Sequence, residues 1–198
     1  MTKNPSAAKF VAFDLGGVLA NVTHSALWTG LACSQAEAEN GYFGGAHHNL
    51  VSVGAISGAE FIKRTASRLG ASSTSICEAW KEVVSLRDDA MEWVAQLCVP
   101  ATIWSNTDPM HFERLSGGLP AHLMDASRRA LSYEVGSQKP DGAFFETALA
   151  RLQIAPSYIL YLDDRLDNIE AARAFGIRAV HVNSTEGLSD ALIAHQVI

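Results

Sequence analysis

The sequence predicts an α/β protein, a three-layer Rossmann-like core with a parallel sheet and a small helical cap inserted after the first strand. A short apolar run, residues 10–13, ends in Asp14 and a glycine pair, which is typical of a buried strand that opens onto a turn. Later apolar runs alternate with stretches of helical periodicity, as in right-handed βαβ units. In such sheets, ligands bind at the carboxyl ends of the strands.

The expected strands are short apolar stretches bounded by polar or turn residues. In chain order they cover residues 10–14, 101–105, 130–132, 158–162 and 178–182. The expected core helices carry apolar residues at helical spacing and cover residues 88–97, 109–114, 142–152 and 168–175. Gly176 follows the last of these helices, at a position where helices commonly end.

The interval between the first two strands is about three times as long as a single crossover connection needs. Its periodicity predicts helices and no strand. The helices are expected at residues 34–40, 58–69 and 75–86. We therefore expect a helical cap, the cap segment, over residues 20–87, and a catalytic core formed by residues 1–19 and 88–198.

Composition bounds the cellular role. A chain of 198 residues can bury a sizeable core, and its net charge of -6 argues against a general binder of nucleic acid or of anionic membranes. Its 3 cysteines show no metal-binding or redox spacing, which favours a reducing cytoplasm. Residues 1–8 lack the apolar region of a signal peptide, and no apolar run is long enough to span a membrane. Both a monomer and a homodimer are compatible with the sequence.

Acidic residues follow two of the expected strands, which suits attack on a phosphate ester. A carboxylate and a phosphate are both anions, so a cation must neutralise them while donors hold the phosphoryl oxygens. Mg²⁺ prefers oxygen ligands and takes one or two carboxylates beside the substrate phosphate. We expect Asp14 to attack phosphorus and to share this ion with Asp164 and the backbone carbonyl of Gly16.

Further residues would bind the phosphoryl group. Ser105 and Asn106 offer hydroxyl and amide donors, and Gly17 lets an anionic group approach the backbone closely. Lys139 supplies a compact positive charge, and Asp163 orients Lys139 or a metal-bound water. Each residue also has a structural interpretation, because Ser105 and Asn106 are good helix N-caps, Lys139 precedes a helix, and Asp163 ends a strand.

Four segments resemble, in sequence order, the four motifs of the haloacid dehalogenase superfamily. They are FDLGGVL (residues 13–19), SNT (105–107), GSQKPD (136–141) and LDDRLDNIEAAR (162–173). The resemblance implies that Asp14 forms an aspartyl-phosphate, that Ser105 and Asn106 bind phosphate, and that Lys139 stabilises charge. It also implies that Asp164 ligates magnesium. The first motif is similar to those of small sugar-phosphate phosphatases and of the phosphatase-like domain of soluble epoxide hydrolase.

Gly16 departs from this pattern. Family phosphatases usually place a second aspartate at this position, two residues after the nucleophile, to protonate the leaving oxygen. A positioned acid contributes about 10²- to 10⁴-fold to the rate. Substrates with good leaving groups, such as anomeric or acyl phosphates, would lose the least rate. The candidate replacements are Asp108, His24 and the pair His47 and His48, which we expect in a glycine-flanked loop over the site.

Two other functions compete with a phosphatase of a small phosphorylated metabolite. A haloacid dehalogenase would use Asp14 against a carbon–halogen bond without a metal, and the retained Asp163 and Asp164 argue against it. A non-catalytic phosphate-binding regulatory module is favoured by Gly16 alone. EDTA separates the first alternative from a phosphatase, because it should abolish only metal-dependent turnover. A phosphomutase would also need the acid that Gly16 lacks.

Overall fold

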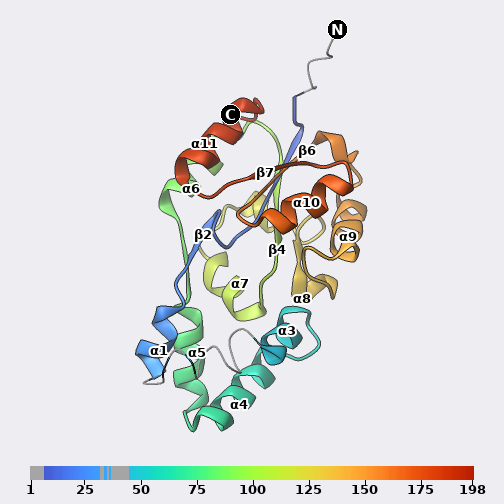
Figure 1. Cartoon of the computed structure of the whole chain (residues 1–198). Coiled ribbons are helices and arrows are strands. Elements are labelled where there is room, and N and C mark those ends of the chain that lie inside the picture. The colour runs from blue at the N-terminus through green and yellow to red at the C-terminus, as the bar shows by residue number, and fades with distance from the viewer. Residues whose placement is uncertain (1–6, 32–33, 35, 37–44) are drawn as a thin grey trace.

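The computed structural model describes residues 7–198, except 32–33, 35 and 37–44. Its central sheet is formed by β1 (Phe10–Phe13), β4 (Ala101–Ser105), β5 (Ala130–Leu131), β6 (Ile159–Asp163) and β7 (Arg178–His181). These 5 strands are parallel and lie in the order β5-β4-β1-β6-β7 (Figure 1). The predicted α/β fold with a parallel sheet is therefore confirmed.

Strand β1 is the strand at which the order of the sheet reverses. The chain passes from β1 to β4 and β5 on one side, and later returns to β6 and β7 on the other. Phe13, the last residue of β1, lies opposite Ile103 of β4 and Leu162 of β6. A ligand crevice forms at such a reversal, outside the carboxyl ends of the strands. The residue that follows β1 therefore lies at the centre of this edge.

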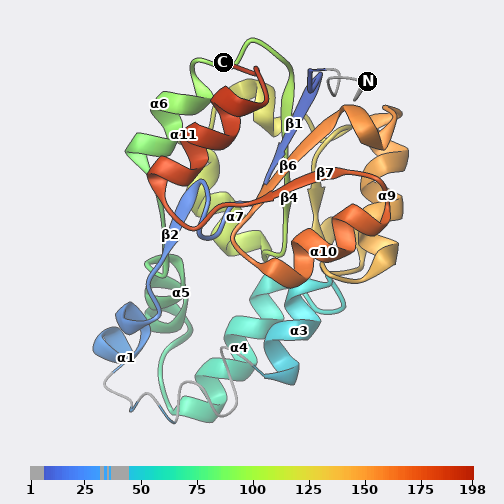
Figure 2. The same ribbon diagram turned by 45° about the horizontal axis from the view of Figure 1, so that its top comes forward.

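Helices cover both faces of the sheet (Figure 2). Side chains alternate along a strand, so Val11 and Phe13 pack into one apolar cluster while Phe10 and Ala12 pack into another. The first cluster includes residues of α6 (Asp88–Val94), α7 (Pro109–Ser116) and α11 (Thr185–Ala194). The second includes residues of α9 (Gly142–Leu152) and α10 (Leu166–Ala174). The sheet and its two helical layers give the predicted three-layer core.

The cap segment joins the core through two short strands that pair with each other. Strands β2 (Ala20–Val22) and β3 (Val84–Leu86) are antiparallel, with Ala20 opposite Leu86. We call this pair the stalk. Beyond it lie α1 (Ser25–Leu31), α3 (Ala46–Ser52), α4 (Gly58–Leu69) and α5 (Ser73–Lys81). The prediction of no strand in this interval was wrong, because strands of 3 residues are too short to show an alternating pattern.

Local signals explain most element ends. The helix expected over residues 58–69 is confirmed as α4, where the Ser57 side chain accepts from the Glu60 amide and Gly70 ends the helix in a left-handed conformation. The helix expected over residues 75–86 ends earlier, at Lys81, since the next segment pairs in the stalk. His47 and His48 were expected in a loop but lie in α3. Most of the helix expected over residues 34–40 falls outside the described residues.

The remaining elements are short. They are η1 (Ala121–Met124), α8 (Ser132–Val135) and η2 (Pro156–Tyr158). Within the described ranges, none of the helices combines the length and the apolar character that a bilayer crossing requires.

Candidate active site

Asp14 lies directly after β1, at the centre of the carboxyl edge of the sheet. Its amide donates to the Leu162 carbonyl of β6 (2.9 Å), so it continues the strand pairing, and one carboxylate oxygen accepts from the Leu15 amide (2.8 Å). Asp14 is only 7% exposed. Ser105 ends the neighbouring strand on one side and Asp163 ends the neighbouring strand on the other. Three of the predicted residues therefore share one edge.

Lys139 is the buried cation of this cluster. Its ammonium group contacts the Trp104 carbonyl (2.8 Å), Asp163 Oδ2 (2.7 Å) and Asp14 Oδ1 (3.0 Å). An ammonium group has three donors, so each has an acceptor. The Lys139 side chain is fully buried. The single positive charge is therefore shared by two carboxylates.

Asp163 is held by donors on every side. Its Oδ1 accepts from the Arg165 amide (2.8 Å) and from Asn168 Nδ2 (3.0 Å), while Oδ2 accepts from Lys139, the Tyr161 hydroxyl and Asn168. Burial alone would raise the pKa of Asp163. The Lys139 charge and these hydrogen bonds outweigh burial and bring the pKa below its usual range. With its oxygens so engaged, Asp163 suits positioning of Lys139 better than direct contact with a cation.

The pKa of Asp14 moves in the opposite direction. Burial is the largest effect and raises this pKa, the Lys139 charge lowers it, and the Asp163 charge raises it again. A hydrogen bond from Ser105 also lowers it. The net result is a rise from 3.8 to about 6. Asp14 is thus the carboxyl group of this pair that holds a proton more readily when no further cation is nearby.

Asp164 completes an oxygen cluster. One ligand atom from each of Asp14, Asp163 and Asp164 lies within 4.8 Å of the others. Burial raises the pKa of Asp164, and the Asp163 charge raises it further, so a cation here would relieve a repulsion. Ligands on opposite sides of one Mg²⁺ lie about 4.2 Å apart, given metal–oxygen distances of about 2.1 Å. The donor set suits this hard ion, and the 4.8 Å limit on the spread of the three oxygens is slightly wider than this span.

Gly17 makes room for Asp164. Its φ of 74° lies in the left-handed region, and a Cβ atom built on it would lie 2.3 Å from Asp164 Oδ2. The Gly17 amide donates to the Ala20 carbonyl (2.8 Å), and its own carbonyl accepts from Arg87 (3.3 Å). Gly17 lines the cavity, as expected of a residue near substrate, but its N–H already has a partner.

The side-chain amide of Asn106 makes two hydrogen bonds to the backbone of Lys139. Its Nδ2 donates to the Lys139 carbonyl (2.7 Å), and its Oδ1 accepts from the Lys139 amide (2.8 Å). One N–H of the Asn106 side chain remains for a phosphoryl oxygen. The residue therefore joins two motifs that lie 33 positions apart.

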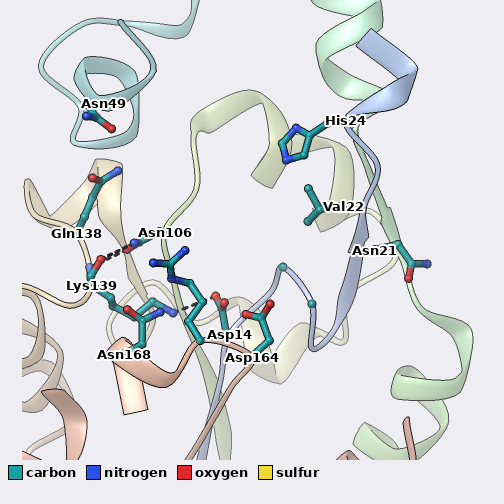
Figure 3. A pocket seen from close by; sticks show the side chains of 13 residues that line it. Asp14, Asn21, Val22, His24, Asn49, Asn106, Gln138, Lys139, Asp164 and Asn168 are labelled. Atoms are coloured by element: carbon teal, nitrogen blue, oxygen red, sulfur yellow. Dashed lines mark hydrogen bonds and ion pairs between the residues drawn. The ribbon is translucent and has the colours of Figure 1, made fainter. Parts of the chain in front are cut away.

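A cavity of about 710 Å³, which we call the polar chamber, opens over this cluster. Its lining includes Asp14, Gly16, Gly17, Asn106, Lys139 and Asp164, which the sequence predicts. The chamber is also lined by Asn21, Val22, His24, Asn49, Gln138, Arg165 and Asn168. Figure 3 shows His24 and Asn49 on the opposite side of the chamber from Asp14 and Asp164. Asn168 is buried and belongs to the fourth motif, and its polar side chain shortly after Asp163 in that motif was the signal that could have indicated it.

The candidates for the missing acid occupy different places. Asp108 is fully buried, caps α7 by accepting from the Met110 amide (2.9 Å), and accepts from the Trp80 indole of the cap segment (3.0 Å). It therefore links α7 to the cap segment, and it lines neither cavity next to Asp14. His47 lines neither cavity, whereas His24 lines both. Of these candidates, His24 is the one that reaches the polar chamber.

The raised pKa of Asp14 makes stability depend on pH. Protonation of Asp14 contributes stability that is fully present below about pH 3.8 and is lost as the pH rises through about 6. Asp14→Asn removes the titration, so in EDTA its free energy of unfolding should rise relative to wild type between pH 4.5 and 7.5. The difference between the two pKa values corresponds to at most about 3 kcal/mol. Urea unfolding at both pH values measures it, and a pH-independent difference would contradict the assigned direction.

Residues 8–176 match the family model described as haloacid dehalogenase-like hydrolase. The chain is 27% identical over 101 residues to the sesquiterpene phosphatase astK of Aspergillus oryzae, a match that covers 50% of this chain and 45% of that protein. It is 41% identical over 49 residues to the drimenol cyclase drtB of Aspergillus calidoustus, covering 25% of this chain and 9% of that protein. The chain thus spans less than half the length of either curated relative.

The fold is similar to that of a HAD family enzyme, bt-2542 of Bacteroides thetaiotaomicron, whose crystal structure is a complex with magnesium and inorganic phosphate. The TM-score is 0.77 at 22% identity, and the match covers 88% of this chain and 93% of that one. At this identity the likeness concerns the fold alone.

Proposed function

We propose that this chain, which belongs to the haloacid dehalogenase-like hydrolase family, is a magnesium-dependent phosphatase that acts on a small phosphorylated metabolite. The observation that carries the proposal is the convergence of Asp14, Lys139 and Asp164 at one edge of the sheet. The similarity to the sesquiterpene phosphatase astK and to bt-2542, which was crystallised with magnesium and inorganic phosphate, supports the same chemistry. The acidic pair at residues 163–164 favours it over a metal-free dehalogenase.

In the proposed reaction, a carboxylate oxygen of Asp14 attacks phosphorus. A bond forms between that oxygen and phosphorus while the ester P–O bond breaks, and the leaving oxygen takes a proton. Water then hydrolyses the aspartyl-phosphate. Mg²⁺, when bound by Asp14 and Asp164 with the Gly16 carbonyl, supplies positive charge to the phosphoryl oxygens. Lys139 adds a fixed charge, and Ser105 and Asn106 donate to the phosphoryl group.

Asp164→Asn tests the metal assignment. It removes one charge from the oxygen cluster, so we expect Mg²⁺ affinity, measured by isothermal titration calorimetry, to fall by at least about tenfold. Asp167→Asn is the matched control, because Asp167 is partly exposed and pairs with Arg165 (2.6 Å). Equal affinity in the Asp164 variant and wild type would refute the ligand assignment. EDTA should abolish wild-type turnover.

We propose His24 as the group that protonates the leaving oxygen in place of an aspartate at residue 16, since it lines both cavities. Figure 3 shows its ring across the polar chamber from Asp14. His24→Gln should lower turnover of alkyl phosphates by about 10²- to 10⁴-fold. Acetyl phosphate, whose leaving group needs no proton, should lose far less. Steady-state kinetics on both substrates measure the contrast, and an equal loss on both would rule out proton donation by His24.

A non-catalytic phosphate-binding module remains the alternative that Gly16 favours. Beryllium fluoride with Mg²⁺ forms a phosphate mimic on a reactive aspartate. Stable trapping on Asp14 without turnover of any phosphate ester would support the binding module over the phosphatase.

The wider assignment is part of the same proposal. Residues 20–87 would act as the cap of the site and residues 1–19 and 88–198 as its catalytic core, which is supported by the contribution of His24 and Asn49 to the polar chamber. The free thiols of Cys77 and Cys98 support a reducing compartment such as the cytoplasm.

A further inference from the structure

A second, smaller cavity adjoins the polar chamber. It measures about 140 Å³, and we call it the inner chamber. Its apolar lining consists of Leu15, Ala20, Val22, Trp80, Val83, Val84 and Leu115, from the core and the cap segment. Apart from Val22, each of these side chains is at most 6% exposed. Gly16, His24, Ser105 and Asn106, which the proposed mechanism uses, also line it, so the inner chamber adjoins the phosphoryl site. Its apolar part has no role in the mechanism described so far.

The polar residues that line the inner chamber are His24, His48, Ser105, Asn106, Thr107 and His111. His111 has one ring nitrogen 3.0 Å from Asp108 and the other 2.8 Å from the Trp80 carbonyl, so both nitrogens face protein acceptors and neither is left for a ligand. Its ring stacks on Trp80 at 4.4 Å. His48 lies edge-on to Trp80 at 5.3 Å, and burial lowers its pKa, which favours the neutral imidazole. A mostly apolar space of this kind favours a hydrocarbon group over a sugar or a nucleotide.

Gly16 lies at the boundary that the two chambers share, which we call the opening. Gly16, Val22, His24 and Asn106 line both of them. A Cβ atom on Gly16 would lie 3.2 Å from Val22 Cγ2, so any side chain at this position would crowd the opening. The absence of a side chain here thus removes an acid and at the same time leaves a passage from the phosphate site to the inner chamber.

We infer that the inner chamber binds the apolar part of the substrate, and that the substrate is the monophosphate ester of an apolar alcohol. This inference rests on the proposed phosphatase function. The phosphoryl group lies at Asp14, the ester oxygen crosses the opening beside Gly16 and His24, and the alkyl group fills the inner chamber. A cavity of about 150 Å³ holds a benzene molecule, so about six carbons next to the ester oxygen fit.

The first test is a series of straight-chain alkyl monophosphates, from methyl to hexyl phosphate, with Mg²⁺. Each methylene that leaves water contributes about 0.8 kcal/mol, which is about a fourfold change. We expect kcat/KM to rise by on the order of 10² between ethyl and hexyl phosphate. Acetyl phosphate serves as the small polar reference. Turnover of acetyl phosphate with a flat alkyl series would overturn the inference and leave the phosphatase proposal intact.

Val22→Phe places an aromatic ring at the opening. The position is 44% exposed and lies in a strand, so the larger side chain has room outside the core. We expect the ratio of kcat/KM for hexyl over methyl phosphate to fall at least about tenfold. Ser85→Phe is the matched control, because Ser85 is an exposed residue of the partner strand and lines neither chamber. An unchanged ratio in the Val22 variant would contradict the inference.

Binding separates the chamber from catalysis. If no phosphate ester is turned over, the phosphatase proposal fails, and calorimetry with hexylphosphonate and methylphosphonate on the full chain still tests the inner chamber. We expect tighter binding and a more negative heat-capacity change for the hexyl compound. Equal affinities and equal heat-capacity changes would overturn the inference.

Discussion

Replacing Asp14 by asparagine is expected to abolish phosphatase turnover, lowering kcat by more than about 10⁴-fold. The amide keeps the shape of the side chain but is not a nucleophile, and it removes one of the two carboxylates proposed to bind Mg²⁺. Asp14 directly follows the central strand, within 3.0 Å of the Lys139 ammonium group. Steady-state kinetics with excess Mg²⁺ and acetyl phosphate measure the loss.

The control for this variant is Asp125→Asn, which makes the same chemical change at an exposed residue that binds Ser127 (2.7 Å). It should retain full turnover. An unchanged circular dichroism spectrum of the Asp14 variant under the assay conditions would show that loss of turnover does not come from unfolding. Undiminished turnover would end the hypothesis of a covalent aspartyl-phosphate.

Lys139→Met is expected to lower the free energy of unfolding by about 3–5 kcal/mol at neutral pH. Methionine fills similar space but leaves the buried carboxylates of Asp14 and Asp163 without their cation. Urea denaturation monitored by circular dichroism measures the change. Lys81→Met is the control, because Lys81 pairs with the exposed side chain of Glu113 (3.3 Å). Such a pair should contribute at most about 1 kcal/mol to the free energy of unfolding.

The double variant Asp14→Asn with Lys139→Met separates charge from packing. If the loss comes from two facing carboxylates, Lys139→Met should cost less in the Asp14→Asn background, where one of the charges is gone. Asp163 would still accept from the Arg165 amide and from Asn168. Equal costs in both backgrounds would show that the loss comes from packing and that the buried charge pair is not its origin.

The residues that end strands could be predicted from the sequence. Asp14, Ser105 and Asp163 each follow or close an apolar run, and parallel strands bring their carboxyl ends to one edge whatever the loops do. Family resemblance then supplied the order of the motifs. Helix α4 could be predicted for a similar reason, because Ser57 and Gly70 mark its two ends locally.

Features that depend on distant partners could not be predicted. The two strands of the stalk are defined by their pairing, since Asn21 pairs with Ser85 at the other end of the cap segment. The partner of the Asn106 amide is the backbone of Lys139, and nothing near Asn106 in the chain indicates it. The inner chamber arises where the core, the stalk and α5 meet. From the sequence, Gly16 therefore indicated only a missing acid, and not the space beside it.

The stalk also has a consequence for engineering. Ala20 and Leu86 are paired, so the chain leaves and re-enters the core at points about 5 Å apart. A segment whose ends lie so close can be exchanged as a cassette without rethreading the rest of the chain. A short glycine turn grafted between these two residues would yield a lidless core, and helical segments from other proteins could be inserted at the same junction to give new substrate preferences.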